Sequence, residues 1–176
     1  TVTAGTATGI TSIAATVPGT ITDNGCTSVT AYGVEYSTTN NFANGSGTPV
    51  PGSNLSGNNF SVSLSGLTPS TVYYYHTYAT NAGGTGYSAQ GTFTTATPTL
   101  SATSLTAFGN VCINTTAGPN SFTITGSNLT AANITVAALA GYTYSTTSGG
   151  TYTPTLTLTQ AGGTYSQVVF RSEERR

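Results

Sequence analysis

The feature of this chain that most limits its fold is an alternation of apolar and polar residues with a period of two. Successive side chains of a β-strand point to opposite faces, so this alternation predicts strands that bury one face. No stretch shows the period of an amphipathic helix. In the first half of the sequence the residues expected to point inward are Ile13, Ala15, Val17, Ile21, Tyr32, Val34, Tyr36, Phe60, Val62, Leu64, Tyr73, Tyr75, Thr77, Ala79, Tyr87 and Phe93. Short strands separated by turn residues predict an antiparallel β-sandwich.

The second half of the chain repeats this pattern with different residues. Its expected strand faces are Leu105, Phe108, Phe122, Ile124, Ile134, Val136, Tyr142, Tyr144, Leu156 and Leu158. Between the halves, Thr-Ala-Thr-Pro at residues 95–98 is typical of a linker. A chain of 176 residues is long enough for two domains. We therefore expect an all-β fold of two tandem antiparallel β-sandwiches, the first at residues 1–96 and the second at residues 97–176.

Charged side chains are almost absent, at 4% of the residues, whereas ordinary soluble domains carry roughly 25%. Most of them lie within the last six residues, namely Arg171, Glu173, Glu174, Arg175 and Arg176. The rest of the chain lacks the basic surface that nucleic-acid binding requires. It also lacks a nucleophile elbow, a phosphate-binding loop and a dinucleotide fingerprint. We therefore expect a protein that is not an enzyme and does not bind nucleic acid.

The acids, bases and thiols that precede this charged end are Asp23, Glu35, His76 and two cysteines. They are too few for the ligand set of a zinc or calcium site, so we expect no metal and no cofactor. Asp23 and Glu35 could form the two-carboxylate pair of a glycosidase. The alternative, which we favour, is that Asp23 caps an Asp-Asn-Gly turn and Glu35 faces solvent between two inward-pointing residues.

Hydroxyl and amide side chains dominate the surface that this composition implies. No run of about 20 apolar residues is present, so we expect no membrane-spanning segment. We expect a secreted, extracellular or cell-surface protein, with any secretion signal removed or outside this sequence.

Glycosylation on oxygen would account for solubility with so little charge. Six asparagines also begin Asn-x-Ser/Thr sequons, namely Asn44, Asn54, Asn59, Asn114, Asn128 and Asn133, but in a chain so rich in Thr, Ser and Asn some such matches are expected by chance.

Four segments of the first half resemble a known family. They are Leu-Thr-Pro-Ser-Thr-Val-Tyr at residues 67–73, Tyr-Ala-Thr-Asn at 78–81, Ile-Thr-Asp-Asn-Gly at 21–25 and Gly-Val-Glu-Tyr-Ser-Thr-Thr at 33–39. The first two resemble the tyrosine corner and following strand of fibronectin type III domains, and the last two resemble the versions found in large secreted proteins of Bacteroidetes-type bacteria. The resemblance implies that the Tyr73 hydroxyl reaches the backbone at this corner. It also implies that Tyr36 occupies the place of the usual core tryptophan.

Two segments of the second half resemble an immunoglobulin-like module of bacterial surface proteins. They are Ser-Phe-Thr-Ile-Thr-Gly-Ser-Asn-Leu at residues 121–129 and Ala-Gly-Tyr at 140–142. That family continues through one further strand after the strand at residues 167–170. Here Arg-Ser-Glu-Glu-Arg-Arg follows instead, so we expect the second sandwich to lack a strand or to have an atypical last one.

These observations support three functional hypotheses. The first is an extracellular structural subunit of a bacterial surface fibre or filament, in which copies of the chain assemble head to tail through sandwich contacts or strand complementation. The second is a repeat fragment of a large cell-surface adhesin. The third is a carbohydrate-binding accessory module of a secreted enzyme.

A stripe of rings is the best candidate for recognition of a glycan or a protein. Tyr74, His76 and Tyr78 are expected on the outward face of one strand, where they would span roughly 13 Å. Tyrosine rings stack on sugars or pack in interfaces. Equally, cross-strand rings can simply stabilise the sheet.

A sandwich that lacks a strand exposes unpaired backbone groups, which proteins cover or pair with another chain. We therefore expect a neighbouring copy to complete the second domain through residues 1–9 or 165–176. The candidate assembly strands contain Thr1, Val2, Thr3, Val168, Val169 and Phe170.

The two cysteines, Cys26 and Cys112, are expected to lie far apart in an extended pair of domains. A disulfide needs Cα atoms within about 7 Å. Because one thiol would lie near the head of the molecule and the other near its tail, we predict a disulfide between successive copies. Two unpaired thiols and a folded-back pair of domains are the alternatives.

Overall fold

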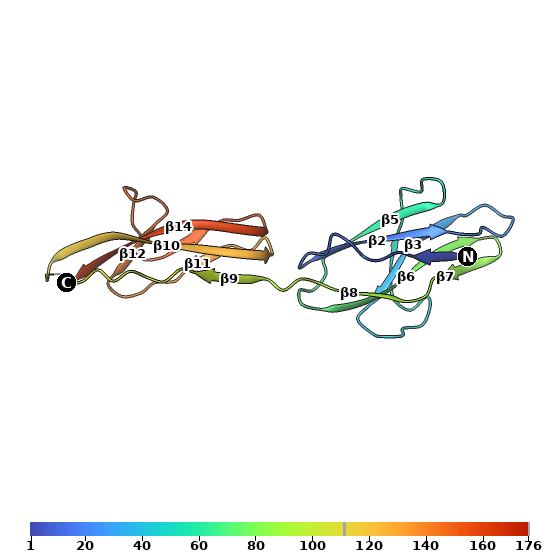
Figure 1. The fold of residues 1–176 in the computed structure, drawn as a ribbon, viewed down its shortest axis with the longest axis horizontal. Helices are drawn as coiled ribbons and strands as arrows, with labels where there is room; N and C mark the ends of the chain where they lie inside the picture. The colour runs from blue at the N-terminus through green and yellow to red at the C-terminus, as the bar shows by residue number, and fades with distance from the viewer. Residues whose placement is uncertain (111, 176) are drawn as a thin grey trace. The chain divides into compact units, whose positions relative to one another are not determined.

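The computed structural model describes residues 1–110 and 112–175 of the chain, and its regular elements within these ranges are all β-strands. The strands form antiparallel sheets, which confirms the expected all-β sandwich class. The chain divides into two compact units, unit 1 at Thr1–Thr97 and unit 2 at Pro98–Arg176. Figure 1 shows the strands of both units.

Unit 1 is built from two facing sheets (Figure 1). The first has the order β1-β2-β5 and consists of β1 (Val2–Ala4), β2 (Ala14–Ile21) and β5 (Asn59–Ser65). The second has the order β4-β3-β6-β7 and consists of β4 (Thr48–Pro51), β3 (Ala31–Ser37), β6 (Val72–Asn81) and β7 (Gly84–Tyr87), with β8 (Gly91–Thr94) also paired to β6.

The core of unit 1 lies between these sheets and follows the alternation of the sequence. Its centre is fully buried, with Val17 and Val34 at 0% exposure and Leu64 at 1%. The other buried members are Val2, Ala7, Ala15, Ile21, Phe60, Val62, Leu67, Tyr73, Tyr75 and Phe93. Two expected core residues lie elsewhere: Ile13 is exposed because it precedes the first residue of β2, and Tyr87 lies outside this core cluster.

Tyr73 forms the corner that the resemblance implies. Its hydroxyl oxygen accepts a hydrogen bond from the Thr68 amide at 3.0 Å. Its ring stacks on Phe93, with centroids 5.6 Å apart, and meets Tyr36 edge-on at 5.7 Å. Tyr36 is half-buried and packs against the core. The corner therefore fixes the start of β6 by side-chain packing and one backbone hydrogen bond.

Unit 2 pairs a four-stranded sheet with a much smaller one. The large sheet has the order β12-β14-β10-β9 and consists of β12 (Tyr142–Ser145), β14 (Gly163–Arg175), β10 (Thr115–Leu129) and β9 (Thr99–Ala102). The small sheet consists of β11 (Ile134–Val136) and β13 (Leu156–Leu158). Because the small sheet is so short, the buried core among the described residues is limited to Phe122, Ile124, Tyr144, Leu158 and Val169.

The charged end of the chain is part of the last strand, because β14 continues through Arg175. Residues 170–173 of β14 pair with β12 on one side, and β10 runs along the other side. Arg171 is 7% exposed. Its guanidinium lies over the rings of Phe108 at 4.7 Å and Tyr142 at 5.0 Å, and it donates to the Thr106 carbonyl at 2.7 Å. Two rings and a carbonyl thus hold an arginine inside the unit.

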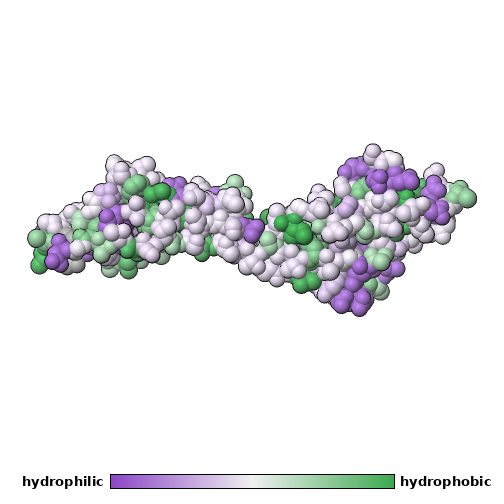
Figure 2. Space-filling model, in the orientation of Figure 1, coloured by the Kyte–Doolittle hydropathy of each residue, from purple (hydrophilic) through white to green (hydrophobic). Residues whose placement is uncertain are grey.

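One expected strand face of unit 2 is also wrong. Leu105 is 55% exposed and belongs to no strand, because the chain leaves the sheet after Thr103. Figure 2 shows that strongly hydrophobic and strongly hydrophilic residues lie in small, scattered groups on the visible face. None of the described residues forms a helix of the length and apolarity that a membrane crossing requires.

Candidate functional site

The predicted ring stripe on β6 is not a continuous exposed surface. Tyr74 and Tyr78 are half-buried, and His76 is only 8% exposed. The Phe42 ring covers His76, with centroids 4.8 Å apart, and the His76 Nδ1 lies 2.9 Å from the Ser88 carbonyl oxygen. These side chains share the face that the alternation along the strand predicts, but the loop at residues 38–47 covers the middle of the stripe.

Glu35 explains why this loop lies on the sheet, and the expectation that Glu35 faces solvent is wrong. The residue is 2% exposed and is the register partner of His76 across β3 and β6. Its two carboxylate oxygens accept hydrogen bonds from the amides of Gly45 at 2.9 Å and Gly47 at 2.5 Å. Bonds to an ionised acceptor are the stronger kind. A buried carboxylate thus anchors the loop that carries Phe42.

A hollow of about 330 Å³ lies beside Glu35. Tyr78 and Tyr87 line it, with ring centroids 6.2 Å apart. The Tyr78 ring lies over Gly33, where a Cβ atom would come within 2.8 Å of the Tyr78 hydroxyl. Because the neighbouring strand has a glycine at this position, the tyrosine can lie across the sheet rather than stand away from it.

The two tyrosines of this hollow keep their protons at neutral pH. Burial raises the pKa of Tyr78 above its ordinary value, and the negative charge of Glu35 raises it further. Burial and Glu35 also raise the pKa of Tyr87, as does Tyr78. Both hydroxyls are therefore available as hydrogen-bond donors.

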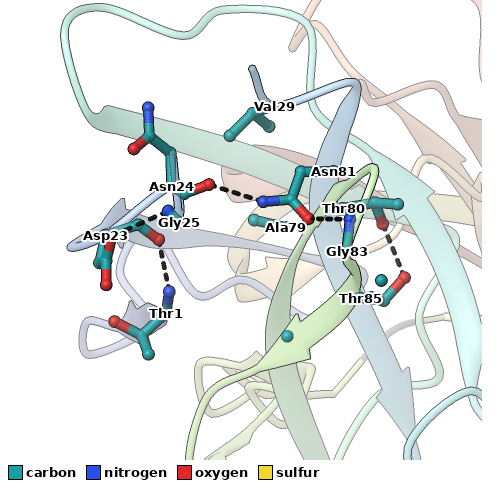
Figure 3. A pocket seen from close by; sticks show the side chains of 12 residues that line it. Thr1, Asp23, Asn24, Gly25, Val29, Ala79, Thr80, Asn81, Gly83 and Thr85 are labelled. Carbon is teal, nitrogen blue, oxygen red and sulfur yellow. Dashed lines mark hydrogen bonds between the residues drawn. The ribbon is translucent and has the colours of Figure 1, made fainter. Parts of the chain in front are cut away.

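A second hollow, of about 380 Å³, lies between the turn at residues 23–25 and the β6–β7 hairpin (Figure 3). Asp23 caps the turn as expected, because its Oδ1 accepts from the Gly25 amide at 2.8 Å. Asn81 joins the turn to the hairpin: its side-chain nitrogen donates to the Asn24 carbonyl at 2.6 Å, and its side-chain oxygen accepts from the Gly83 amide at 2.8 Å.

The two hollows share two threonines. Thr80 and Thr85 line both of them, and their hydroxyl oxygens lie 2.8 Å apart. Tyr78, Thr80, Thr85 and Tyr87 lie on one face of the β6–β7 pair, whereas Ala79 and Gly86, which line the second hollow, belong to the opposite face. The two hollows are therefore separate, and we define the polar groove of unit 1 as the hollow of about 330 Å³ lined by Glu35, Tyr78, Tyr87, Thr80 and Thr85. Within the described residues no group of three His, Cys, Asp or Glu side chains is placed to hold a metal ion.

The other candidate site is the edge of β14. Thr123 exchanges hydrogen bonds with Thr103, since its carbonyl accepts from the Thr103 amide at 3.0 Å and its amide donates to the Thr103 hydroxyl at 2.9 Å. Its backbone groups therefore point away from β14. In an antiparallel pair the register partner then also points away, so the N–H and C=O of Val168 lie on the far side of β14.

That far side is open along part of β14. β12 pairs there only from Phe170 onward, and no other strand of the described residues pairs there. Because backbone direction alternates, Ser166 presents its N–H and C=O to the same side as Val168. The Val168 carbonyl accepts from the Gln167 side chain at 2.8 Å. Val169, by contrast, is fully buried, and Phe170 is half-buried.

The expected assembly strand at the start of the chain is already paired within its own unit. Val2–Ala4 forms β1, in which Val2 is the register partner of Ile21 on β2, and the Val2 side chain is buried. β1 is the edge strand of its sheet. Thr1, Val2 and Thr3 are therefore not a free donor strand, although the outer side of β1 is a sheet edge.

Both cysteines are exposed and neither forms a disulfide within the chain. Cys26 follows the Asp23 turn and has a positive φ of 62°. Cys112 lies in the connection between β9 and β10. The disulfide between copies stays a prediction.

Sequence reasoning missed Phe42 and Tyr87 as site residues. Phe42 is the one large aromatic side chain in the polar, glycine-rich run of residues 37–49, and this isolation was the signal. Tyr87 was placed in the core, whereas it lies beside Tyr78 as its register partner on β7. The sequence does not reveal that pairing, because it depends on the turn that joins β6 to β7.

Two comparisons with known proteins found a match, and the family match supports the fold of unit 1. Residues 12–95 match the family described as the purple acid phosphatase N-terminal domain, a non-catalytic β-sandwich of fibronectin III-like fold. The sensor domain of the anti-sigma factor RsgI4 from Pseudobacteroides cellulosolvens is 20% identical with a TM-score of 0.41, over 55% of this chain and 94% of that one. No curated protein matches the chain.

Proposed function

We propose that this protein is an extracellular structural subunit of a bacterial surface fibre, in which a fibronectin type III unit precedes an immunoglobulin-like unit. Copies of the chain join through the open edge of β14. The match of residues 12–95 to a non-catalytic domain supports an auxiliary role for unit 1. The observation that carries the proposal is the stretch of β14 around Ser166 and Val168, whose backbone groups face a side without a paired strand.

An open edge of this kind is a template for another strand. Main-chain hydrogen bonds supply the affinity when a strand adds to an exposed sheet edge, and no specific side chain is required. Natural proteins usually protect such edges with charge, proline or a covering segment. Between Gly163 and Phe170 the sequence of β14 has no charged residue and no proline. This part of the strand therefore lacks the usual protection.

The occupant that we propose is β1 of the next copy. β1 is an edge strand held to β2 by its register, and its outer side is not paired with another strand of the described residues. Edge-to-edge pairing of β1 with β14 would join unit 1 of one copy to unit 2 of the next without displacing either strand. Repetition of this heterologous contact generates a fibre rather than a closed dimer when the rotation does not close.

Proline substitutions test the proposal, because each removes one backbone N–H. Ser166→Pro removes an N–H on the open side, where proline is tolerated in strands. The protein should keep its β circular dichroism but remain monomeric by light scattering, whereas the unchanged chain forms filaments in electron micrographs. Gln167→Pro is the matched control: it removes an N–H directed at β10 and should unfold unit 2. A wild-type chain that stays monomeric, or Ser166→Pro filaments, would overturn the proposal.

The predicted bond between Cys26 of one copy and Cys112 of the next would reinforce such a fibre. Both thiols are exposed, so neither has to be uncovered. On a non-reducing gel we expect a ladder that collapses to a monomer when reductant is added. A monomer band without reductant would refute the disulfide while leaving the strand pairing to the proline test.

The adhesin hypothesis differs from the fibre in how the units are connected. In an adhesin, further domains of the same chain would supply the strand beside β14, so the isolated 176-residue chain would not form filaments. The filament assay on the unchanged chain therefore separates the two hypotheses. We favour the fibre because both edges required for the contact, β1 and β14, are present within this one chain.

A further inference from the structure

We propose that the polar groove of unit 1 binds a neutral oligosaccharide. This inference goes beyond the fibre role, because the groove lies on β3, β6 and β7 whereas the assembly edge lies on β14. The groove is the hollow of about 330 Å³ lined by Glu35, Tyr78, Tyr87, Thr80 and Thr85. It has the size of a small-molecule site.

The lining of the groove offers both kinds of contact that a sugar needs. Tyr78 and Tyr87 supply ring surface together with a hydroxyl, and such amphipathic rings bind groups that are apolar on one face and polar at the edge. Thr80 and Thr85 supply hydroxyls that both donate and accept.

Charge selects a neutral ligand. All three basic side chains of the protein, Arg171, Arg175 and Arg176, belong to unit 2, so unit 1 contains no lysine or arginine. The carboxylate of Glu35 lines the groove. An anionic saccharide would be repelled and would find no basic partner. A neutral, hydroxyl-rich chain meets acceptors and donors without a charge penalty.

The groove is fixed by its own hydrogen bonds before any ligand arrives. Glu35 holds the loop on one side through Gly45 and Gly47. On the other side the hydroxyl oxygens of Thr80 and Thr85 lie within hydrogen-bond distance of each other, at 2.8 Å. Side chains that are already oriented lose little entropy on binding, which favours affinity in a shallow site.

This site differs from the ring stripe expected from the sequence in one testable residue. Tyr78 belongs to both, but Tyr74 lies outside both hollows and His76 is covered by Phe42. Tyr74→Ala should therefore leave sugar binding unchanged if the groove is the site. The same substitution should abolish binding if the stripe is the site.

Calorimetric titration with defined hexasaccharides tests the inference. The probes are cellohexaose, xylohexaose, mannohexaose and chitohexaose, with hexagalacturonate as the anionic comparator. We expect at least one neutral probe to bind with a Kd on the order of 1 mM, as suits a shallow site without ion pairs, and the anionic probe not to bind. Tyr87→Ala should weaken binding roughly five- to tenfold through loss of a ring contact.

Thr85→Val keeps the branched shape of an exposed residue and removes only the shared hydroxyl, so it remains informative if Tyr87→Ala does not fold. It should also weaken binding, while Ser166→Pro should bind sugar normally even though it does not assemble. Failure of all neutral probes to bind would overturn the inference. Unchanged binding by Thr85→Val and Tyr87→Ala, or loss of binding in Tyr74→Ala, would overturn it as well.

Discussion

Units 1 and 2 share a threonine- and glycine-rich composition but close their sandwiches to different degrees. In unit 1 two sheets of comparable extent enclose a core that includes Val17, Val34 and Leu64, each at or below 1% exposure. In unit 2 a large sheet is covered by two strands of three residues each, and Val169 is the one apolar residue at 0% among those described. The extent of the second sheet, rather than the composition, thus decides how many apolar side chains are shielded from water.

The two units also use their few charges differently. Unit 1 buries a carboxylate, Glu35, which backbone amides satisfy and which anchors a loop. Unit 2 buries a guanidinium, Arg171, which stands in for apolar core and lies against Phe108 and Tyr142. In unit 1 the buried carboxylate orders a surface loop. In unit 2 the buried arginine side chain occupies volume between two aromatic rings. This difference leads to four predictions.

The largest expected effect is in the core of unit 1. Leu64→Ala removes a fully buried side chain and should lower the free energy of unfolding of unit 1 by about 3 kcal/mol. Val169→Ala, the matched change in unit 2, removes fewer carbons and should cost about 1.5 kcal/mol. Calorimetry should show two transitions, with unit 2 melting first because its core is smaller. Equal shifts of both transitions by either variant would show that the units do not melt separately.

Arg171 should be the most sensitive charged residue of unit 2. Arg171→Ala removes two ring contacts and the bond to Thr106, and it should lower the free energy of unfolding of unit 2 by about 2 kcal/mol. Arg171→Lys keeps the charge but loses the planar fork, so it should recover only part of that loss. Urea unfolding followed by tyrosine fluorescence measures both. Full recovery with lysine would mean that charge alone matters.

Glu35 should matter less to stability but more to the groove. Glu35→Gln cannot accept two amide hydrogen bonds at its side chain equally well, because one oxygen becomes a donor group. We expect unit 1 to lose about 1.5 kcal/mol and the loop at residues 38–47 to become susceptible to limited proteolysis. Asp23→Asn, an exposed carboxylate, is the control and should change neither. An intact loop in Glu35→Gln would show that packing of Phe42 suffices to hold it.

The smallest expected effect is a difference in how steeply the free energy of unfolding of each unit falls at alkaline pH. Burial raises the pKa of Tyr75, Tyr78 and Tyr87 in unit 1, and it raises that of Tyr144 in unit 2, where Arg171 opposes the shift. A tyrosine with a raised pKa ionises first in the unfolded chain, so its stabilisation is complete below about pH 10 and falls as pH rises further. The unit 1 transition should therefore fall more steeply above about pH 10. A steeper fall of unit 2 would contradict this assignment.

The sequence predicted strand faces well, because burial follows a period of two wherever a strand has one covered side. Val17, Leu64 and Tyr73 were found in this way. The same reasoning failed at Glu35 and His76, since alternation gives the direction of a side chain and does not say what covers it. That cover comes from Phe42, on a loop without a periodic pattern.

The burial of Arg171 was not predicted from the sequence, for a related reason. Arg171 stands in a run of charges that normally indicates an exposed tail, and only contacts with Phe108, 63 residues earlier, and with Tyr142 make its burial favourable. The candidate groove could not be predicted from the sequence for the same reason. Glu35, Thr85 and Tyr87 come together through strand register, which depends on turns between strands.

Amide hydrogen exchange on the assembled protein tests the edge of β14 most directly. The amides of Gln167 and Val169 point toward β10 and should be protected in monomer and fibre alike. The amides of Ser166 and Val168 point to the open side, so they should exchange rapidly in the monomer and slowly in the fibre. Fibres in which Ser166 and Val168 still exchange rapidly would contradict assembly through this edge.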